Sequence, residues 1–110
     1  MTDLTNEELN EAVVLALGWT MYNASIGHVF TNPNEYGSVY RLKDLSWATN
    51  AQACLDDLLP AVEEDYSVAF THRRGEWIVW LETDDGPWRE FRAPTLARAI
   101  CLCFIAVIKP

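Results

Sequence analysis

The stretch that decides the fold is LARAICLCFIAVI, residues 96–108, in which Arg98 is the only residue that is not apolar. It belongs to a chain of 110 residues whose formal net charge is -8. Three interpretations are open for it: a membrane anchor, a cysteine-based redox or metal site, or a helix that is buried on more than one side. The choice among them limits which functions the chain can have.

Length and spacing argue against the first two interpretations. The longest unbroken apolar run, residues 99–108, has only ten residues, whereas a membrane-spanning helix needs about 20. Cys101 and Cys103 are two positions apart, so a helix points them away from each other, and Cys54 makes the cysteine count odd. We therefore expect reduced cysteines that pack as small hydrophobic residues. The stretch then predicts a helix covered by a sheet on one side and by another helix, or a second subunit, on the other.

Length and composition indicate one folded domain spanning residues 1–110. Half of the residues are hydrophobic, and glycine and proline are few, so the chain can bury one core. The opening residues MTDLTNEELN have neither the basic start nor the apolar run of a signal peptide. We therefore expect a cytoplasmic protein that has no membrane anchor.

Helix signals occur at three places. Thr5 and Glu8 form a capping box, an apolar repeat follows, and Gly18 supplies a stop, which together predict a helix over residues 6–17. Thr49 and Gln52 form a second possible capping box, before a helix that Pro60 either ends or continues as a further turn. The third helix is the stretch quoted above, opened by Pro94 or Thr95.

Strand signals predict a small antiparallel sheet. YSVAFTH and EWIVWLE, residues 66–72 and 76–82, flank a short connection that contains glycine, which is typical of a hairpin, and residues 88–92 form a third strand. One or two short strands are expected near residues 28–30 and 38–42. Both faces of the strand at residues 76–82 are largely apolar, which favours a sheet covered on both sides. Strands and helices together predict an α+β fold.

Charge is unevenly distributed along the chain. Residues 1–65 carry eleven acidic and two basic side chains, whereas residues 66–110 carry five acidic and six basic ones. Affinity for nucleic acid comes mostly from clustered Lys and Arg at phosphates, so the acidic majority argues against a protein that binds DNA or RNA. A small phosphorylated ligand stays open, because arginine binds phosphate through a planar donor fork and most arginines lie in the second half.

Tryptophan and arginine together supply a minimal nucleotide site: a flat face for the base and a donor fork for phosphate. Trp77 and Trp80 are better explained as core or interface residues than as stacking platforms. Solvation and pairing with neighbouring acids is the alternative explanation for each arginine. The candidate ligand-binding residues are Trp47, Thr49, Asn50, Arg73, Arg74, Trp88, Arg89 and Arg98.

The sequence offers little support for catalysis. It has no GxSxG, HExxH, P-loop or GxGxxG motif, and neither His28 nor His72 occurs in a pattern typical of a catalytic triad. The acidic run Glu63, Glu64, Asp65 is better explained as a solvated helix end than as paired acids for proton transfer. We therefore expect no catalytic residues, no cofactor and no metal site.

Four segments of the chain resemble the phage ABA sandwich family, small bacteriophage proteins with an α/β/α layered domain. They are LTNEELNEAVVLALGW at residues 4–19, WATNAQACLDDL at residues 47–58, YSVAFTHRRGEWIVWL at residues 66–81 and APTLARAICLCFIA at residues 93–106. Family members often have Tyr-Ser/Thr-Thr-Asp where this chain has WATN at residues 47–50. The resemblance implies a three-layer α/β/α sandwich with a small, mainly antiparallel sheet and about three helices.

The resemblance also implies a function, because related small phage proteins resemble sponges that sequester nucleotide signals of bacterial immunity. The first hypothesis is a non-enzymatic counter-defence sponge for a cyclic dinucleotide or a cyclic ADP-ribose derivative, acting in the host cell cytoplasm. The alternative is an acidic inhibitor or DNA mimic that binds a host protein. Acids gathered at residues 3–11, 56–65 and 82–90 favour that alternative.

Excess apolar surface predicts self-association. Val14 and Leu15 extend the apolar surface of the first helix beyond its core stripe, the last helix is apolar all round, and both faces of one strand are apolar. A single small domain has too little interior to cover all of these surfaces. We therefore expect a homo-oligomer, a dimer or a multiple of dimers.

Overall fold

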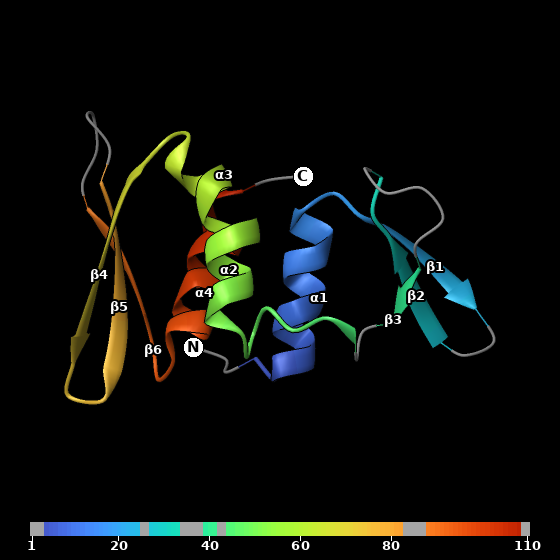
Figure 1. The fold of residues 1–110 in the computed structure, drawn as a ribbon, viewed down its shortest axis with the longest axis horizontal. Coiled ribbons are helices and arrows are strands. Elements are labelled where there is room, and N and C mark those ends of the chain that lie inside the picture. Colours follow the sequence, from blue (N-terminus) through green and yellow to red (C-terminus); the bar gives the residue numbers. More distant parts are fainter. Residues whose placement is uncertain (1–3, 25–26, 34–38, 42–43, 83–87, 109–110) are drawn as a thin grey trace.

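A computed structural model describes residues 4–24, 27–33, 39–41, 44–82 and 88–108 (Figure 1). The elements follow one another as α1 (Asn6–Ala16), β1 (Thr20–Ala24), β2 (Gly27–Thr31), β3 (Tyr40–Arg41), α2 (Ala51–Asp57), α3 (Leu59–Glu63), β4 (Ser67–Arg73), β5 (Glu76–Glu82), β6 (Arg89–Ala93) and α4 (Leu96–Val107). The strands form two antiparallel three-stranded sheets, ordered β1-β2-β3 and β4-β5-β6.

The helices lie in the middle of an elongated molecule, with one sheet at each end (Figure 1). Helix α4 packs against β5 and β6 on one side and against α1 and α2 on the other. Its residues Ala99, Ile100, Cys101 and Phe104 are fully buried. The structure therefore confirms that residues 96–108 contain a central helix that a sheet and other helices cover.

The α+β class is confirmed, whereas the three-layer α/β/α sandwich is not. The described chain has two sheets and four helices where one sheet and about three helices were expected. The helices lie between the sheets, so the expected covering of both sheet faces fails for β4–β6 within the described residues (Figure 1). Strand β1, which was not predicted, pairs with β2 to build the β1–β3 sheet. No helix of the described ranges has the length and apolar content needed to cross the membrane.

Helix α1 begins and ends as its sequence predicts. The Thr5 hydroxyl accepts the Glu8 backbone N–H at 3.1 Å, and the Glu8 carboxylate accepts the Thr5 backbone N–H at 2.9 Å. These hydrogen bonds with Thr5 hold the pKa of the Glu8 carboxyl below its ordinary value. At the other end Gly18 adopts a φ of 84°, and the Trp19 N–H donates to the Val14 carbonyl at 3.2 Å. This Schellman ending turns the chain so that Trp19 follows directly after the helix.

The start of α2 corrects one prediction. Asn50, and not Thr49, is the N-cap, because the Asn50 side-chain oxygen accepts the Ala53 N–H at 3.1 Å. Gln52 does not close a capping box, since its amide donates to Asp56 at 3.0 Å. Pro60 falls in the first turn of α3, which agrees with the expectation that it either ends the second helix or begins a further turn.

The hairpin β4–β5 is confirmed, with Arg73 opposite Glu76 and a two-residue turn between them. Arg74 and Gly75 have φ values of 53° and 80°, the positive values that a type I′ turn requires. Alternation then gives the sheet two faces. The inner face, with Val79 and Leu81 of β5 buried in the core, meets α4, and the outer face carries the alternate residues.

Asn10 is the buried polar residue that joins α1 to the segment before α2. Its amide nitrogen donates to the Leu45 carbonyl at 3.0 Å, and its side-chain oxygen accepts the Ala48 N–H at 2.8 Å. Only 5% of Asn10 is exposed, so water does not replace these partners if the side chain is lost. The two hydrogen bonds fix the position of residues 45–48 against the helix.

We predict that Asn10→Ala lowers the free energy of unfolding by about 2–4 kcal/mol, because it leaves a buried carbonyl and a buried N–H without partners. Urea unfolding followed by circular dichroism measures the change. Gln52→Ala is the matched control, since its hydrogen bond to Asp56 is exposed and its loss is expected to cost less than about 0.5 kcal/mol. A loss for Asn10→Ala as small as that of the control would contradict the assignment.

Candidate functional site: an acidic aromatic pocket

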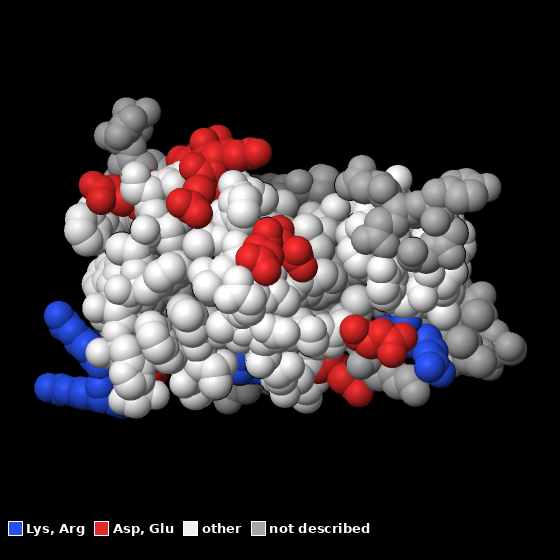
Figure 2. Space-filling view, viewed as in Figure 1, with Lys and Arg blue, Asp and Glu red and all other residues white. Residues whose placement is uncertain are grey.

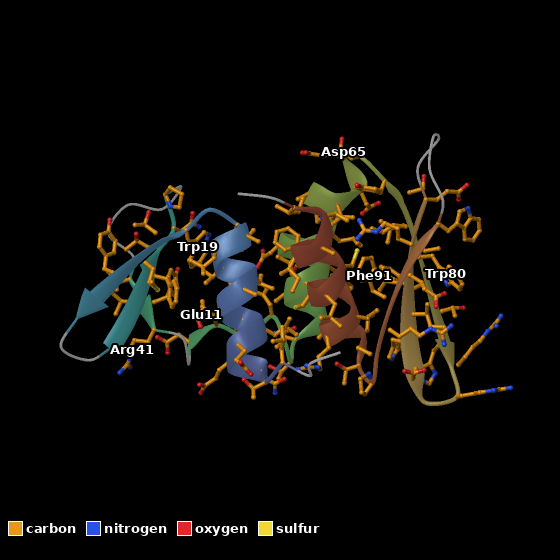
Figure 3. The ribbon with its side chains drawn as sticks, turned by 180° about the vertical axis from the view of Figure 1, so that it is seen from behind. Glu11, Trp19, Arg41, Asp65, Trp80 and Phe91 are labelled. Carbon is orange, nitrogen blue, oxygen red and sulfur yellow. The ribbon has the colours of Figure 1, made fainter. Side chains whose placement is uncertain are left out.

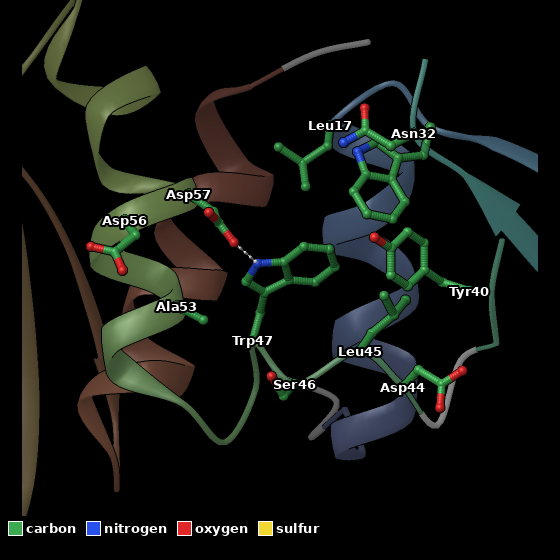
Figure 4. A pocket seen from close by; sticks show the side chains of 11 residues that line it. Leu17, Asn32, Tyr40, Asp44, Leu45, Ser46, Trp47, Ala53, Asp56 and Asp57 are labelled. Carbon is green, nitrogen blue, oxygen red and sulfur yellow. Dashed lines mark hydrogen bonds between the residues drawn. The ribbon is translucent and has the colours of Figure 1, made fainter. Parts of the chain in front are cut away.

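A hollow of about 520 Å³ lies between α2, the end of α1 and the β1–β3 sheet (Figure 4). Its volume falls within the range of roughly 300–1,000 Å³ that is usual for small-molecule sites. Its lining residues are Leu17, Trp19, Asn32, Tyr40, Asp44, Leu45, Ser46, Trp47, Ala53, Asp56 and Asp57. We call this hollow the acidic aromatic pocket.

Three aromatic side chains form one side of the pocket. The ring of Trp19 lies 5.3 Å from the ring of Tyr40 and 5.7 Å from the ring of Trp47, the second contact being edge to face. Trp47 is buried, while Trp19 and Tyr40 are partly exposed. The pocket therefore offers π surface from residues that are widely separated in the sequence.

Three carboxylates lie around these rings. The Asp57 carboxylate accepts the indole N–H of Trp47 at 3.0 Å and points toward the ring, whereas Asp44 and Asp56 lie farther out on opposite sides (Figure 4). Asp44 also accepts the Arg41 backbone N–H at 3.0 Å and lies 3.8 Å from the Arg41 guanidinium. Asp57 is thus the acid that is hydrogen-bonded directly to a tryptophan side chain of the pocket.

Backbone contacts hold Trp47 in place from behind. The Cys54 thiol donates to the Trp47 carbonyl at 3.0 Å, and the next residue, Ala48, is held by Asn10 at 2.8 Å. On the opposite side the Schellman ending of α1 positions Trp19. The aromatic side of the pocket is therefore fixed by the same contacts that join the helices.

This lining has the chemistry of a cation site. Cations are attracted to the faces of Trp and Tyr and to carboxylates, and both attractions strengthen where water is partly excluded. No Lys or Arg is among the lining residues that the structure describes. A phosphate placed here would face the carboxylates of Asp56 and Asp57, while the Arg41 guanidinium is already paired with Asp44 at 3.8 Å.

Of the predicted ligand-binding residues in the first half of the chain, one lines the pocket. That residue is Trp47, whose indole N–H donates to the Asp57 carboxylate. The Thr49 hydroxyl donates to the Ser46 carbonyl at 3.3 Å, and Asn50 caps α2. Thr49 and Asn50 thus make local backbone hydrogen bonds and do not line the pocket.

The predicted arginines do not converge on Trp47. Arg73 and Arg74 lie exposed at the β4–β5 turn, at the opposite end of the molecule from the β1–β3 sheet (Figure 1). The Arg89 guanidinium lies over the Phe91 ring, 5.4 Å from its centre. Arg98 donates to the Asn6 side chain at 2.7 Å and to the Leu4 carbonyl, so it ties α4 to the segment before α1.

Trp88, the second predicted aromatic residue, also lies away from the pocket. It is 62% exposed and meets Trp80 edge to face at 5.7 Å. Figure 3 shows Trp80 on the β4–β6 sheet and Trp19 on the opposite side of the helices. Among the predicted residues, Trp47 therefore lies in the pocket, whereas Trp88 and the four arginines lie around β4–β6 and α4.

Among the aromatic and acidic residues of the pocket, sequence reasoning missed Trp19, Tyr40, Asp44, Asp56 and Asp57. The signal for Trp19 was present, because a tryptophan directly after a helix-ending glycine is placed by the turn itself. Nothing in the local sequence around Tyr40 or Asp57 indicates that they meet Trp47.

The three cysteines are free and buried, as expected. The Cys54 and Cys101 sulfurs lie 3.7 Å apart, and their hydrogen bond, together with burial, raises the pKa of the Cys101 thiol. Burial raises the pKa of the Cys103 thiol to about 12. Thiols in this state are poor nucleophiles and poor metal ligands at neutral pH, and no cluster of metal-binding side chains occurs among the described residues.

We predict that a water-soluble thiol reagent leaves the native protein unmodified and reacts with three thiols per chain in denaturant. The reason is that all three thiols are buried away from water and that the pKa values of the Cys101 and Cys103 thiols are raised. Mass spectrometry of the native and unfolded samples after equal times measures the difference. Rapid modification of Cys54, Cys101 or Cys103 in the native sample would contradict the burial described here.

A comparison with known families finds no family model that matches the chain, and a search of curated proteins finds no match.

Proposed function

We propose that this chain is a non-enzymatic binding protein that captures a small, positively charged organic molecule in the acidic aromatic pocket. The observation that carries this proposal is the hydrogen bond that the Trp47 indole N–H donates to the Asp57 carboxylate, with 3.0 Å between Nε1 and Oδ2. A carboxylate that accepts the indole N–H draws electron density into the ring and adds its own negative charge, so both groups attract a cation placed over them.

The size and polarity of the pocket support a small organic cation over a bare metal ion. Its hollow of about 520 Å³ is larger than a metal ion requires, and three of its eleven described lining residues are aromatic. A quaternary or primary amine with an apolar body fits both features, because its body displaces water from the rings while its charge faces Asp57.

Capture without reaction is supported by the side chains that line the pocket. No histidine, cysteine or lysine is among its described lining residues, and each of its carboxylates already accepts a hydrogen bond: Asp44 from the Arg41 N–H, Asp56 from the Gln52 amide and Asp57 from the Trp47 indole. General acid–base or nucleophilic catalysis usually needs a reactive group and a free base within hydrogen-bond reach.

The phage ABA sandwich resemblance motivates a second ligand class, a nucleotide-derived immune signal. Trp19 and Trp47 offer stacking surface for a base, which favours this class. Its phosphates would have to lie outside the pocket, away from the carboxylates. A ligand screen therefore includes a cyclic dinucleotide and a cyclic ADP-ribose derivative beside the amines.

The test compares choline with 3,3-dimethylbutan-1-ol, which has nearly the same shape but no charge. We predict that calorimetric titration shows tighter binding of choline, and that Asp57→Asn weakens choline binding by about two- to fivefold, the effect of one partly exposed charge. Asparagine keeps an oxygen that accepts the Trp47 indole N–H, so the substitution removes charge and preserves the contact.

Asp65→Asn is the matched control, because Asp65 is an exposed acid at the end of α3, outside the pocket (Figure 3). Choline affinity in this variant should equal that of the unmodified chain. Equal binding of choline and its neutral analogue, or no binding of either, would contradict the cation proposal. Retention of a nucleotide in place of the amines would instead favour the resemblance-based hypothesis.

A further inference from the structure

The outer face of the β4–β6 sheet is a surface that the pocket does not use, with Ile78 and Trp80 at its centre and charged side chains toward its ends. Its side chains run along alternate positions from Arg73 at one end to Glu82 at the other, with Ile78 and Trp80 in the middle. Within the described ranges no helix or strand lies over this face (Figure 1). An open sheet face with tryptophan at its centre is typical of a surface that binds another protein.

A second hollow lies on this face. It measures about 150 Å³, and its lining includes Ala69, Trp80, Glu82 and Trp88. The two tryptophan rings meet edge to face at 5.7 Å, and Trp88 is 62% exposed. Aromatic faces beside a carboxylate make this hollow suited to an arginine side chain.

The charges on this face are separated along the strands. Arg73 and Arg74 lie at the β4–β5 turn, where Arg73 stands opposite Glu76. Arg92 lies near the same end, 2.8 Å from Glu90 and 3.8 Å from Glu76, so two of the bases at this end are partly neutralised and a net positive charge is left. Glu82 lies at the opposite end, beside the hollow. Figure 2 shows basic side chains at the turn and acidic side chains near the other end of the sheet. A surface with a basic end and an acidic end is complementary to a second copy of itself turned end for end.

We propose that this outer face is a homodimer interface in which Arg73 of each chain enters the hollow between Trp80, Trp88 and Glu82 of the other. A two-fold axis that lies between the two facing sheets and runs across their strands brings the basic end of each sheet over the acidic end of the other. Each Arg73 therefore reaches the hollow of the other chain, and the two contacts are identical. The guanidinium then lies against the tryptophan rings and pairs with the Glu82 carboxylate. The covered face also supplies a second layer for the apolar residues at its centre.

The interface is small. Three strands of at most seven residues span roughly 23 by 14 Å, so the dimer is expected to dissociate on dilution in the micromolar range. Sedimentation velocity from low micromolar to near-millimolar protein is therefore the measurement of choice. The expected mass rises from that of one chain toward twice its 12.5 kDa.

Charge reversal in the full chain tests the arginine contact. Arg73→Glu and Glu82→Arg should each weaken dimerisation by about tenfold or more, since each places like charges together at two symmetric sites. The double variant R73E/E82R restores opposite charges at both sites and should return the dimer to within about threefold of the original affinity. Glu63→Arg, on the exposed end of α3, is the matched control and should change nothing.

Circular dichroism and a thermal melt establish that each variant is folded before it is compared. A monomer at every concentration would overturn the proposal. A dimer that both single reversals leave intact would also overturn it, because the chain would then associate through another face. Loss of the dimer in the single variants without recovery in R73E/E82R would refute the pairing of Arg73 with Glu82.

Discussion

The burial of α4 between a sheet and two other helices is the constraint on which the rest of the structure depends. A helix with alanine, isoleucine, cysteine and phenylalanine around its axis is stable in water only when other elements cover it. Strands β5 and β6 cover one side, and α1 and α2 cover the other. Because this one helix contacts so many elements, it determines that the helices form the middle of the molecule and that the sheets lie outside them (Figure 1).

Polar contacts then decide where a pocket can form. Asn10 fixes residues 45–48 to α1, and the Cys54 thiol fixes the Trp47 carbonyl to α2. These buried hydrogen bonds hold Trp47 between two helices that are themselves positioned by α4. The pocket is thus a consequence of core packing, and its acidic lining follows from the excess of acids in the first half of the sequence.

Local signals in the sequence were sufficient for the elements whose stability is local. The capping box of Thr5 and Glu8, the short glycine-containing connection between residues 72 and 76, and the apolar run of α4 each predicted their element correctly. Strand β1 could not be predicted in the same way, because residues 19–47 mix aromatic residues with Asn, Pro and Gly. Its strand character depends on pairing with β2, which is a tertiary property.

The candidate site was predicted only in part, for a related reason. Trp47 was identified, but its partners Trp19, Tyr40 and Asp57 come from three other elements or connections, and a single sequence carries no sign of their meeting. Arg98 was assigned to a ligand as one of the arginines concentrated in the second half of the chain, because arginine binds phosphate through a planar donor fork. Its actual partners, near the start of the chain, are more than 90 positions away.

The central claim is that the acidic aromatic pocket binds a cation through Trp47 and Asp57. The most direct test is a nuclear magnetic resonance spectrum of the indole N–H groups of the five tryptophans, assigned by substitution and recorded during titration with choline. The account predicts that the Trp47 and Trp19 signals shift, whereas those of Trp80 and Trp88 stay in place. Shifts confined to Trp80 and Trp88, or no shift of Trp47 at saturating choline, would contradict it.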